Sequence, residues 1–452
     1  MSFNYCYLIL LINIISLSYS KLIIPFKVQN YEHPKGKLNY FYKNIKINLS
    51  VGTPPQQITL SACLGEYNTF IIGKYCKNFE GIYNENISDT YKFIKNETFV
   101  FEMYDEGNMV KDVFKLGNEE IDDYQFINAL NIQYDHCYDV YCEVLTEPGI
   151  LGLLLQPHAN AEYDFFEYNL INQLKRKDLI SNYNFYFDFG SNITGNIIIG
   201  SLPNETDQTK FEGKELSTIK VSKVDFSLDW AFKFDDIYYG EERLDREIKK
   251  ECLLRIEFGL IKLTFEMEKY VKEDFFDKLI NQTKCTRKNT EELGTTIHYY
   301  YCDKDIDLNN FKPWHFTVNN FGLNFTFTKE DLFLDIGDKY IFLIAFGGSP
   351  KIFLGYPFLK KYQLIFNQDD KTIGYFTNII KEDDKIPIGY IILIAILSVI
   401  LIGLGIFAFV YFYAYKKKKK YAKELSEETD KTNNNEGLIP NEDNNKIIRH
   451  IR

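Results

Sequence analysis

Histidine is scarce in this chain and is not placed to bind metal. Six histidines are scattered over 452 residues, and none stands in a zinc-like spacing with a pair of the eight cysteines. The sequence therefore predicts no metal site, and it offers no pattern that predicts another cofactor.

Positive charge is also in short supply outside the C-terminal tail. Of 52 Lys and Arg, residues 416–452 hold 10, and of 63 Asp and Glu they hold 7. Because residues 1–20 hold none of either, residues 21–415 carry 42 positive against 56 negative side chains. An excess of 14 negative charges argues against nucleic acid as a partner.

Residues 1–20, "MSFNYCYLILLINIISLSYS", predict a secretory signal peptide. An apolar run from Tyr7 to Leu17 is followed by the small residues Ser18 and Ser20. The usual Lys or Arg ahead of the apolar run is missing, so an uncleaved anchor remains an alternative.

A second segment lacks charge altogether. Residues 388–415 contain 28 uncharged residues, enough for a helix to cross a hydrocarbon layer of about 30 Å, and Lys416 to Lys420 follow at once. We predict a transmembrane helix over 386–415, a cytosolic tail over 416–452 and a lumenal or extracellular domain over 21–385, because lysines flank the cytoplasmic side. The sequence thus predicts a single-pass type I membrane protein of the secretory pathway or cell surface.

Seven cysteines follow the signal peptide, and an odd number cannot all pair within one chain. We predict local disulfides from Cys137 to Cys142 and from Cys285 to Cys302, since each pair brackets a short loop or hairpin. The remaining cysteines stay unassigned: Cys63, Cys76 and Cys252.

Potential N-glycosylation sites agree with this topology. Seven Asn-x-Ser/Thr sequons lie in the predicted lumenal part and none in the tail. They are Asn48, Asn86, Asn96, Asn192, Asn204, Asn281 and Asn324.

Between residues 39 and 376 the pattern is that of a mostly β protein. Short apolar or alternating runs such as "NIKINLSVG", "QQITLSACLG" and "KIFLGYPFLKKYQLIFNQDDKTIGYF" are separated by polar turns, and helical spacing is confined to pieces after Glu162 and Glu268. A weak internal repeat places a glycine between apolar strand residues in "SACLGEYNTFIIG" and "RIEFGLIKLTF". Two similar β lobes across a cleft would fit.

Five stretches in order resemble the pepsin-like aspartic proteases. They are "VGTPPQQ" at 51–57, "MYDEGNMVKDVFKLG" from Met103, "EPGILGLLLQP" from Glu147, "DWAFKFDDIYYGEERL" from Asp229 and "IFLGYPFLKKYQLIFNQDDKTIGYF" from Ile352. The resemblance covers about residues 39–376 and implies a bilobal fold with a central cleft, the lobes at about 39–200 and 201–376. It also implies substrate-binding roles for the flap residues Tyr104 and Gly107 and for the loop glycines Gly65 and Gly259.

The resemblance implies two catalytic aspartates, and this chain has neither. Counting from "GTPPQ" places Cys63 at the first position, and counting from Trp230 places Glu257 at the second; the following loop glycines, Gly65 and Gly259, remain. The family needs two facing carboxylates that share one proton, held in place by Thr or Ser hydroxyls. Leu64, Glu66, Phe258 and Leu260 take the hydroxyl positions.

We therefore expect a membrane-anchored pepsin-like protein without protease activity, whose cleft binds extended peptide or protein segments. A thiol beside acidic groups is a poor base, and Cys63 has no histidine nearby in sequence to make it a nucleophile. Three alternatives stay open: an aspartic endopeptidase with an altered dyad, such as a Glu66 and Glu257 pair; a cysteine protease; and a structural or adhesive surface glycoprotein.

Overall fold

The computed structural model divides the chain into two units, residues 1–379 and 380–452, which we describe separately. The structure describes residues 21–32, 38–76, 82–99, 105–131, 147–155, 169–191, 193–224, 227–244, 251–292, 295–378 and 388–433. The predicted signal peptide and the predicted Cys137–Cys142 disulfide lie outside these ranges.

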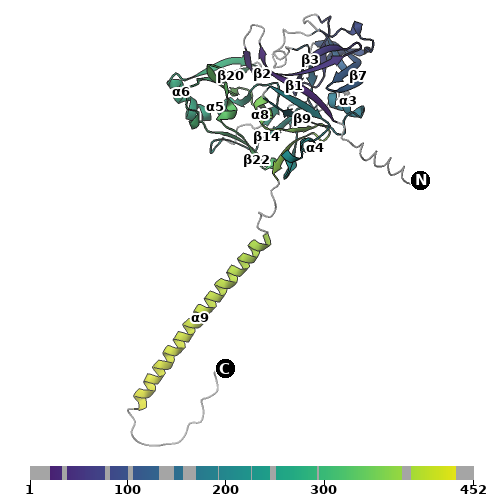
Figure 1. Cartoon of the computed structure of the whole chain (residues 1–452). Helices are drawn as coiled ribbons and strands as arrows, with labels where there is room; N and C mark the ends of the chain where they lie inside the picture. The colour runs from purple at the N-terminus through teal and green to yellow at the C-terminus, as the bar shows by residue number, and fades with distance from the viewer. Residues whose placement is uncertain are drawn as a thin grey trace, which may run out of the picture. The chain divides into compact units, whose positions relative to one another are not determined.

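The largest sheet of the first unit has thirteen strands and includes the N-terminal half of the unit (Figure 1). Its order is β11 (Lys214–Lys220), β28 (Thr372–Asn378), β27 (Ile365–Asn367), β9 (Asn184–Phe189), β10 (Thr194–Ile199), β1 (Leu22–Glu32), β2 (Leu38–Val51), β3 (Gln56–Cys63), β8 (Gly149–Gly152), β4 (Phe70–Ile72), β7 (Glu119–Asn131), β6 (Asp105–Leu116) and β5 (Lys92–Phe99). In β3, Ile58, Leu60 and Ala62 are buried at every second position, and Ser61 and Cys63 are buried as well, so both faces of the strand are covered at its end.

The C-terminal half builds a nine-stranded and a four-stranded sheet. The nine-stranded sheet contains β14 (Ala231–Lys233), β17 (Glu251–Leu254), β26 (Ile352–Leu354), β18 (Ile261–Thr264), β25 (Ile344–Gly347), β20 (Thr295–Asp303), β24 (Lys339–Phe342) and β23 (Phe333–Asp335), with β19 (Cys285–Glu292) on β20. The four-stranded sheet is β16 (Glu242–Arg243), β15 (Asp236–Tyr239), β21 (Trp314–Val318) and β22 (Leu323–Phe327). A short hairpin joins β12 (Lys223–Val224) to β13 (Ser227–Leu228). The predicted mostly β fold is confirmed.

The same strand arrangement occurs once in each half. In the first half β3 pairs with β8 in parallel, β8 with β4 antiparallel, and β4 with β7 in parallel. In the second half β17, β26, β18 and β25 repeat these three pairings in the same order. The weak repeat in the sequence therefore corresponds to a repeated four-strand unit.

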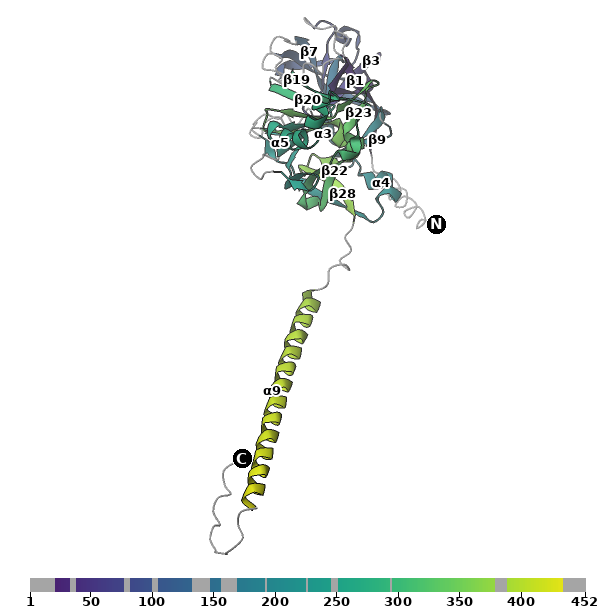
Figure 2. The ribbon, with the colours of Figure 1, turned by 90° about the vertical axis from the view of Figure 1, so that its left-hand side faces the viewer.

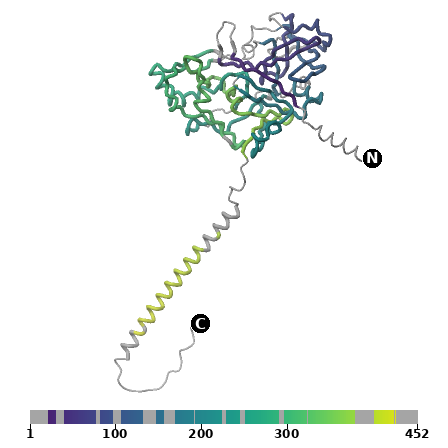
Figure 3. Tube along the Cα trace, in the orientation of Figure 1, coloured from purple at the N-terminus to yellow at the C-terminus, as the bar shows by residue number. Residues whose placement is uncertain are grey.

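The predicted lobe boundaries differ from the sheets in two ways. The first sheet begins at Leu22, since β1 pairs with both β10 and β2, whereas the prediction began at about residue 39. It also takes β11, β27 and β28 from beyond residue 201, because β27 pairs with the edge of β9 (Figure 3). Strands far apart in sequence pair in this sheet, and sequence patterns within a short segment cannot show such a pairing.

The α- and π-helices among the described residues of the first unit are short. They are α3 (Leu170–Arg176), α4 (Pro203–Thr206), α5 (Phe265–Val271), the π-helix η5 (Lys272–Phe276), α6 (Asp277–Asn281), α7 (Lys329–Leu332) and α8 (Tyr356–Lys361). α3 and α6 fall in the two segments predicted as helical, and α5 begins three residues before the second of them. Asn169 caps α3 by accepting the Ile171 N–H at 2.9 Å. α8 lies in a stretch read as strand, where Gly355 and Pro357 begin a helix instead.

The second unit contains one long helix, α9 (Ile388–Asn433), drawn yellow in Figure 2. Its first part covers the predicted membrane span, and Lys416 to Lys420 lie within it. Among the described residues, no helix combines the length and apolarity needed to cross a membrane.

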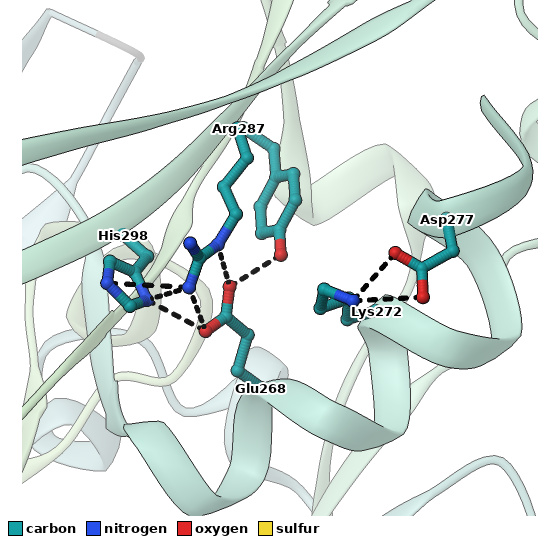
Figure 4. Close-up of polar contacts among 6 residues, drawn as sticks. Glu268, Lys272, Asp277, Arg287 and His298 are labelled. Carbon is teal, nitrogen blue, oxygen red and sulfur yellow. Dashed lines mark hydrogen bonds and ion pairs between the residues drawn. The ribbon is translucent and has the colours of Figure 1, made fainter. Parts of the chain in front are cut away.

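A disulfide and a buried polar cluster fix the β19–β20 hairpin. Cys285 and Cys302 face each other in the hairpin register and are disulfide-bonded, as predicted. The carboxylate of Glu268 on α5 accepts hydrogen bonds from Arg287 at 2.8 and 3.0 Å and from the Tyr300 hydroxyl at 2.5 Å, and it lies 2.8 Å from His298 Nδ1 (Figure 4). The helix is thereby tied to both strands of the hairpin.

Candidate functional site

The two loops that replace the catalytic loops meet in the structure. Cys63 ends β3, and Glu257 lies between β17 and β18; each side chain is 1% exposed. The Leu64 N–H donates to Glu257 Oε2 at 3.3 Å, and the Cys63 thiol lies within hydrogen-bonding reach of the same carboxyl. Residues 193 positions apart thus form one site.

Arg255 is a component of the site that the sequence analysis missed. Its Nη2 bonds to Asp229 Oδ1 at 2.8 Å, and its Nε lies 3.6 Å from Glu257 Oε1. Arg255 is 5% and Asp229 6% exposed, so the guanidinium is buried with two carboxylates. The signal in the sequence was an arginine two residues before Glu257 in the otherwise apolar run "CLLRIEF".

Burial dominates the protonation of the two dyad positions. It raises the pKa of Glu257, while Arg255, backbone N–H groups and Cys63 oppose the rise. Burial also raises the pKa of Cys63 well above its ordinary value, and the negative charges of Glu257 and Glu66 add to the effect. The thiol is therefore neutral at any physiological pH, and the two dyad positions hold one carboxyl between them where the family's chemistry needs two.

The Glu66 side chain accepts hydrogen bonds from the backbone of its own loop. Its Oε1 accepts the N–H groups of Tyr67 and Asn68, each at 2.9 Å, and its side chain is buried. A carboxylate that accepts two backbone N–H groups stabilises a tight turn. This geometry gives Glu66 a role in the turn after Cys63, while its charge also acts on the Cys63 thiol; the alternative of a Glu66–Glu257 dyad stays a prediction.

Apolar side chains fill three of the four positions where the family has hydroxyls. Leu64 is fully buried, and Phe258 and Leu260 are each 4% exposed. The Phe258 ring packs against Tyr42 at 5.8 Å and Phe353 at 5.4 Å between centroids. None of these side chains can donate a hydrogen bond to a carboxylate at residue 63 or 257.

Close backbone contacts explain the glycines of the second loop. A Cβ on Gly259 would lie 2.1 Å from the Tyr40 carbonyl oxygen, and the Gly259 N–H donates to Phe41 O at 2.7 Å. A Cβ on Gly355, which the sequence analysis did not single out, would lie 2.1 Å from Leu260 O. Packing of β2 and α8 on the loop is sufficient reason for both glycines.

Of the other residues predicted to bind substrate, the structure places Gly65 at the site and Gly107 in β6. The Gly65 N–H hydrogen-bonds to the Cys63 sulfur, so this glycine belongs to the site. Gly107 lies within β6 and pairs with Glu97 of β5. The last pair of the β5–β6 hairpin is Phe99 with Asp105, so Gly107 lies two positions further along β6. Tyr104 lies outside the described residues.

A buried lysine lies just beyond the second loop. Lys262 on β18 is 3% exposed, and its Nζ lies 4.5 Å from the centroid of the Phe353 ring. Burial lowers its pKa to about 8. Over the described ranges, no carboxylate forms an ion pair with it.

Metal ligation has no structural basis in the part of the chain that is described, where no three His, Cys, Asp or Glu side chains are grouped to hold an ion.

Comparison with known proteins identifies the scaffold. The sequence model of the family described as eukaryotic aspartyl protease matches residues 44–377, which is more than half of the chain. The match spans both loops of the site and both repeated four-strand units. No curated protein matches the chain.

Proposed function

The chain belongs to the eukaryotic aspartyl protease family, and on that premise we propose that it is a non-catalytic member whose cleft binds extended peptide or protein segments. The observation that carries the proposal is Arg255. A buried guanidinium lies between Asp229 and Glu257, next to the one dyad position that carries a carboxyl, whereas an active member needs two carboxylates that share a proton.

Hydrolysis would require a general base toward water and a general acid toward the scissile carbonyl. Glu257 is the only carboxyl of the two dyad positions, and its oxygens face Arg255 Nε at 3.6 Å and the Leu64 N–H at 3.3 Å. The Cys63 thiol, with its raised pKa, cannot act as the base. With Glu257 only 1% exposed, an attacking water has little access to it.

Peptide binding is supported by the scaffold that remains. The β5–β6 hairpin and the two glycine-containing loops keep the order of the family, and exposed strand edges bind extended segments through backbone hydrogen bonds. Specificity would then come from side chains around the site, since no covalent chemistry is needed.

The test is proteolysis and pepstatin binding by the purified full-length chain. Incubation with a mixed peptide library from pH 3 to 7 should give no cleavage above that of Glu257→Gln. A peptide array should show saturable binding of selected extended peptides. Cleavage at acid pH that pepstatin blocks and Glu257→Gln abolishes would establish an altered but active endopeptidase instead.

An adhesive or structural role is the second candidate. Side chains on the second loop already pack together, with Phe41, Tyr42, Phe258 and Leu260 in one buried cluster. If the array shows no peptide binding and a bulky substitution in the cleft leaves the biological role unchanged, this second candidate replaces the first.

We further propose that the protein is a glycosylated type I membrane protein. Support comes from the 28 uncharged residues at 388–415, the lysines that follow and the one-sided sequons. Sealed microsomes should protect the folded domain from added protease, and glycosidase should reduce its mass. Digestion of that domain in intact microsomes would contradict this topology.

A further inference from the structure

A cavity of about 380 Å³ adjoins the second loop on the side of α8. Gly259 contributes to its wall, together with the apolar side chains of Phe333, Leu343 and Pro357. Its volume is in the range of small-molecule sites. Tyr356, at the start of α8, is 8% exposed and offers an aromatic surface there.

Two lysines flank the Tyr356 ring. Lys43 Nζ lies 5.6 Å and Lys360 Nζ 5.9 Å from the ring centroid. Lys43 also bonds to Asn30 Oδ1, and its backbone N–H donates to Glu257 O at 2.8 Å, which joins the cavity to the candidate site. Burial and the charge of Lys360 lower the pKa of Lys43 to about 8, as expected for two ammonium groups drawn close together.

The carboxylates in the wall also have lysine neighbours, and the charge of Asp331 partly opposes the lowering of the Lys360 pKa by burial. Asp331 Oδ2 lies 2.5 Å from Lys361 Nζ and accepts the Thr328 N–H at 2.7 Å. Glu330 is 68% exposed at its side chain and lies 3.8 Å from Lys329. Within the described ranges, no carboxylate forms an ion pair with Lys43.

We propose that this cavity binds a small organic oxyanion, a carboxylate or phosphate head between Lys43 and Lys360 with a flat apolar body on Tyr356 and Phe333. Two ammonium donors beside an aromatic surface match both parts of such a ligand. A positively charged cavity in a chain of net charge −11 is not part of a generally basic surface. The proposal is independent of whether the cleft binds peptide.

The experiment is titration calorimetry on the full-length chain in a neutral detergent at pH 6.5, below the pKa of about 8 of Lys43. The probes are benzoate and phenyl phosphate, with benzamide as the neutral analogue. We expect saturable binding of at least one anion, about tenfold weaker in Lys360→Met and weaker still in Lys43→Met with Lys360→Met. The anion that binds more tightly distinguishes a carboxylate from a phosphate ligand.

Lys92→Met is the matched control, since this lysine is 62% exposed and pairs with Asp123 away from the cavity. It should bind as the unmodified chain does. Lys360 is also exposed, so its single variant should fold even if the double variant does not. Equal binding in Lys360→Met and the unmodified chain, equal binding of benzamide, or no binding of either anion would overturn the proposal.

Discussion

Replacing Arg255 by Met tests how the charges of the candidate site are balanced. With an effective dielectric constant of about 20, the contacts of Arg255 at 2.8 Å to Asp229 and 3.6 Å to Glu257 correspond to attractions of about 6 and 5 kcal/mol. Much of this offsets the cost of burying three charges. Removal of one partner from a buried ion cluster typically costs about 3–5 kcal/mol, and we expect that loss in the free energy of unfolding at pH 7.

The loss should shrink as the pH falls toward 4. Burial already raises the pKa of Glu257, so the folded protein binds more protons than the unfolded chain just above the ordinary pKa of a glutamate, and this carboxyl lowers stability as the pH rises. Arg255 opposes this rise in the pKa of Glu257, so in Arg255→Met the pKa should be higher still and the loss of stability with rising pH larger. At acid pH a protonated Glu257 no longer needs the guanidinium.

Urea unfolding followed by tryptophan fluorescence measures both effects, because Trp230 and Trp314 are fully buried. Arg243→Met is the control, since Arg243 pairs with Asp236 at the surface and should cost no more than about 1 kcal/mol. A loss below 1 kcal/mol at pH 7 for Arg255→Met, or a loss as large at pH 4 as at pH 7, would refute this account of the site.

Three further changes have defined outcomes. Cys63→Asp with Glu257→Asp should fold but show little or no protease activity until Thr or Ser also stands at residues 64, 66, 258 and 260; strong activity of the double variant would show that the hydroxyls are dispensable. Lys262→Met should stabilise the protein at pH 7 by up to about 3 kcal/mol, because burial lowers the pKa of Lys262 to about 8, and this gain should fade from pH 8 to 10.5. The exposed Lys269→Met is the control in the same denaturation assay, and no gain in stability at pH 7 would count against a buried charge at Lys262. Cys285→Ser with Cys302→Ser should lower the free energy of unfolding by about 3 kcal/mol, as expected for a loop of this length, and an unchanged urea midpoint would contradict a stabilising disulfide.

The sequence was informative about features that can be located by counting residues along the chain. Counting from "GTPPQ" and from Trp230 led to two loops that meet at 3.3 Å, and the Cys285–Cys302 disulfide followed from a local hairpin. Arg255 was missed because its partner Asp229 lies 26 residues away, and only folding brings the two together. The cavity around Lys43 and Tyr356 joins residues from opposite ends of the domain for the same reason.

The thirteen-stranded sheet, which takes strands from both halves of the domain, has a consequence for how the protein is synthesised. β9 ends at Phe189, but its partner β27 begins at Ile365, so 175 residues must be synthesised between them. At about 5–20 residues per second, the edge of β9 stays unpaired for roughly 10 to 35 s. An open strand edge over that time invites pairing with other chains. We therefore expect the nascent N-terminal half to depend on chaperones until the last strands of the domain emerge and complete the sheet.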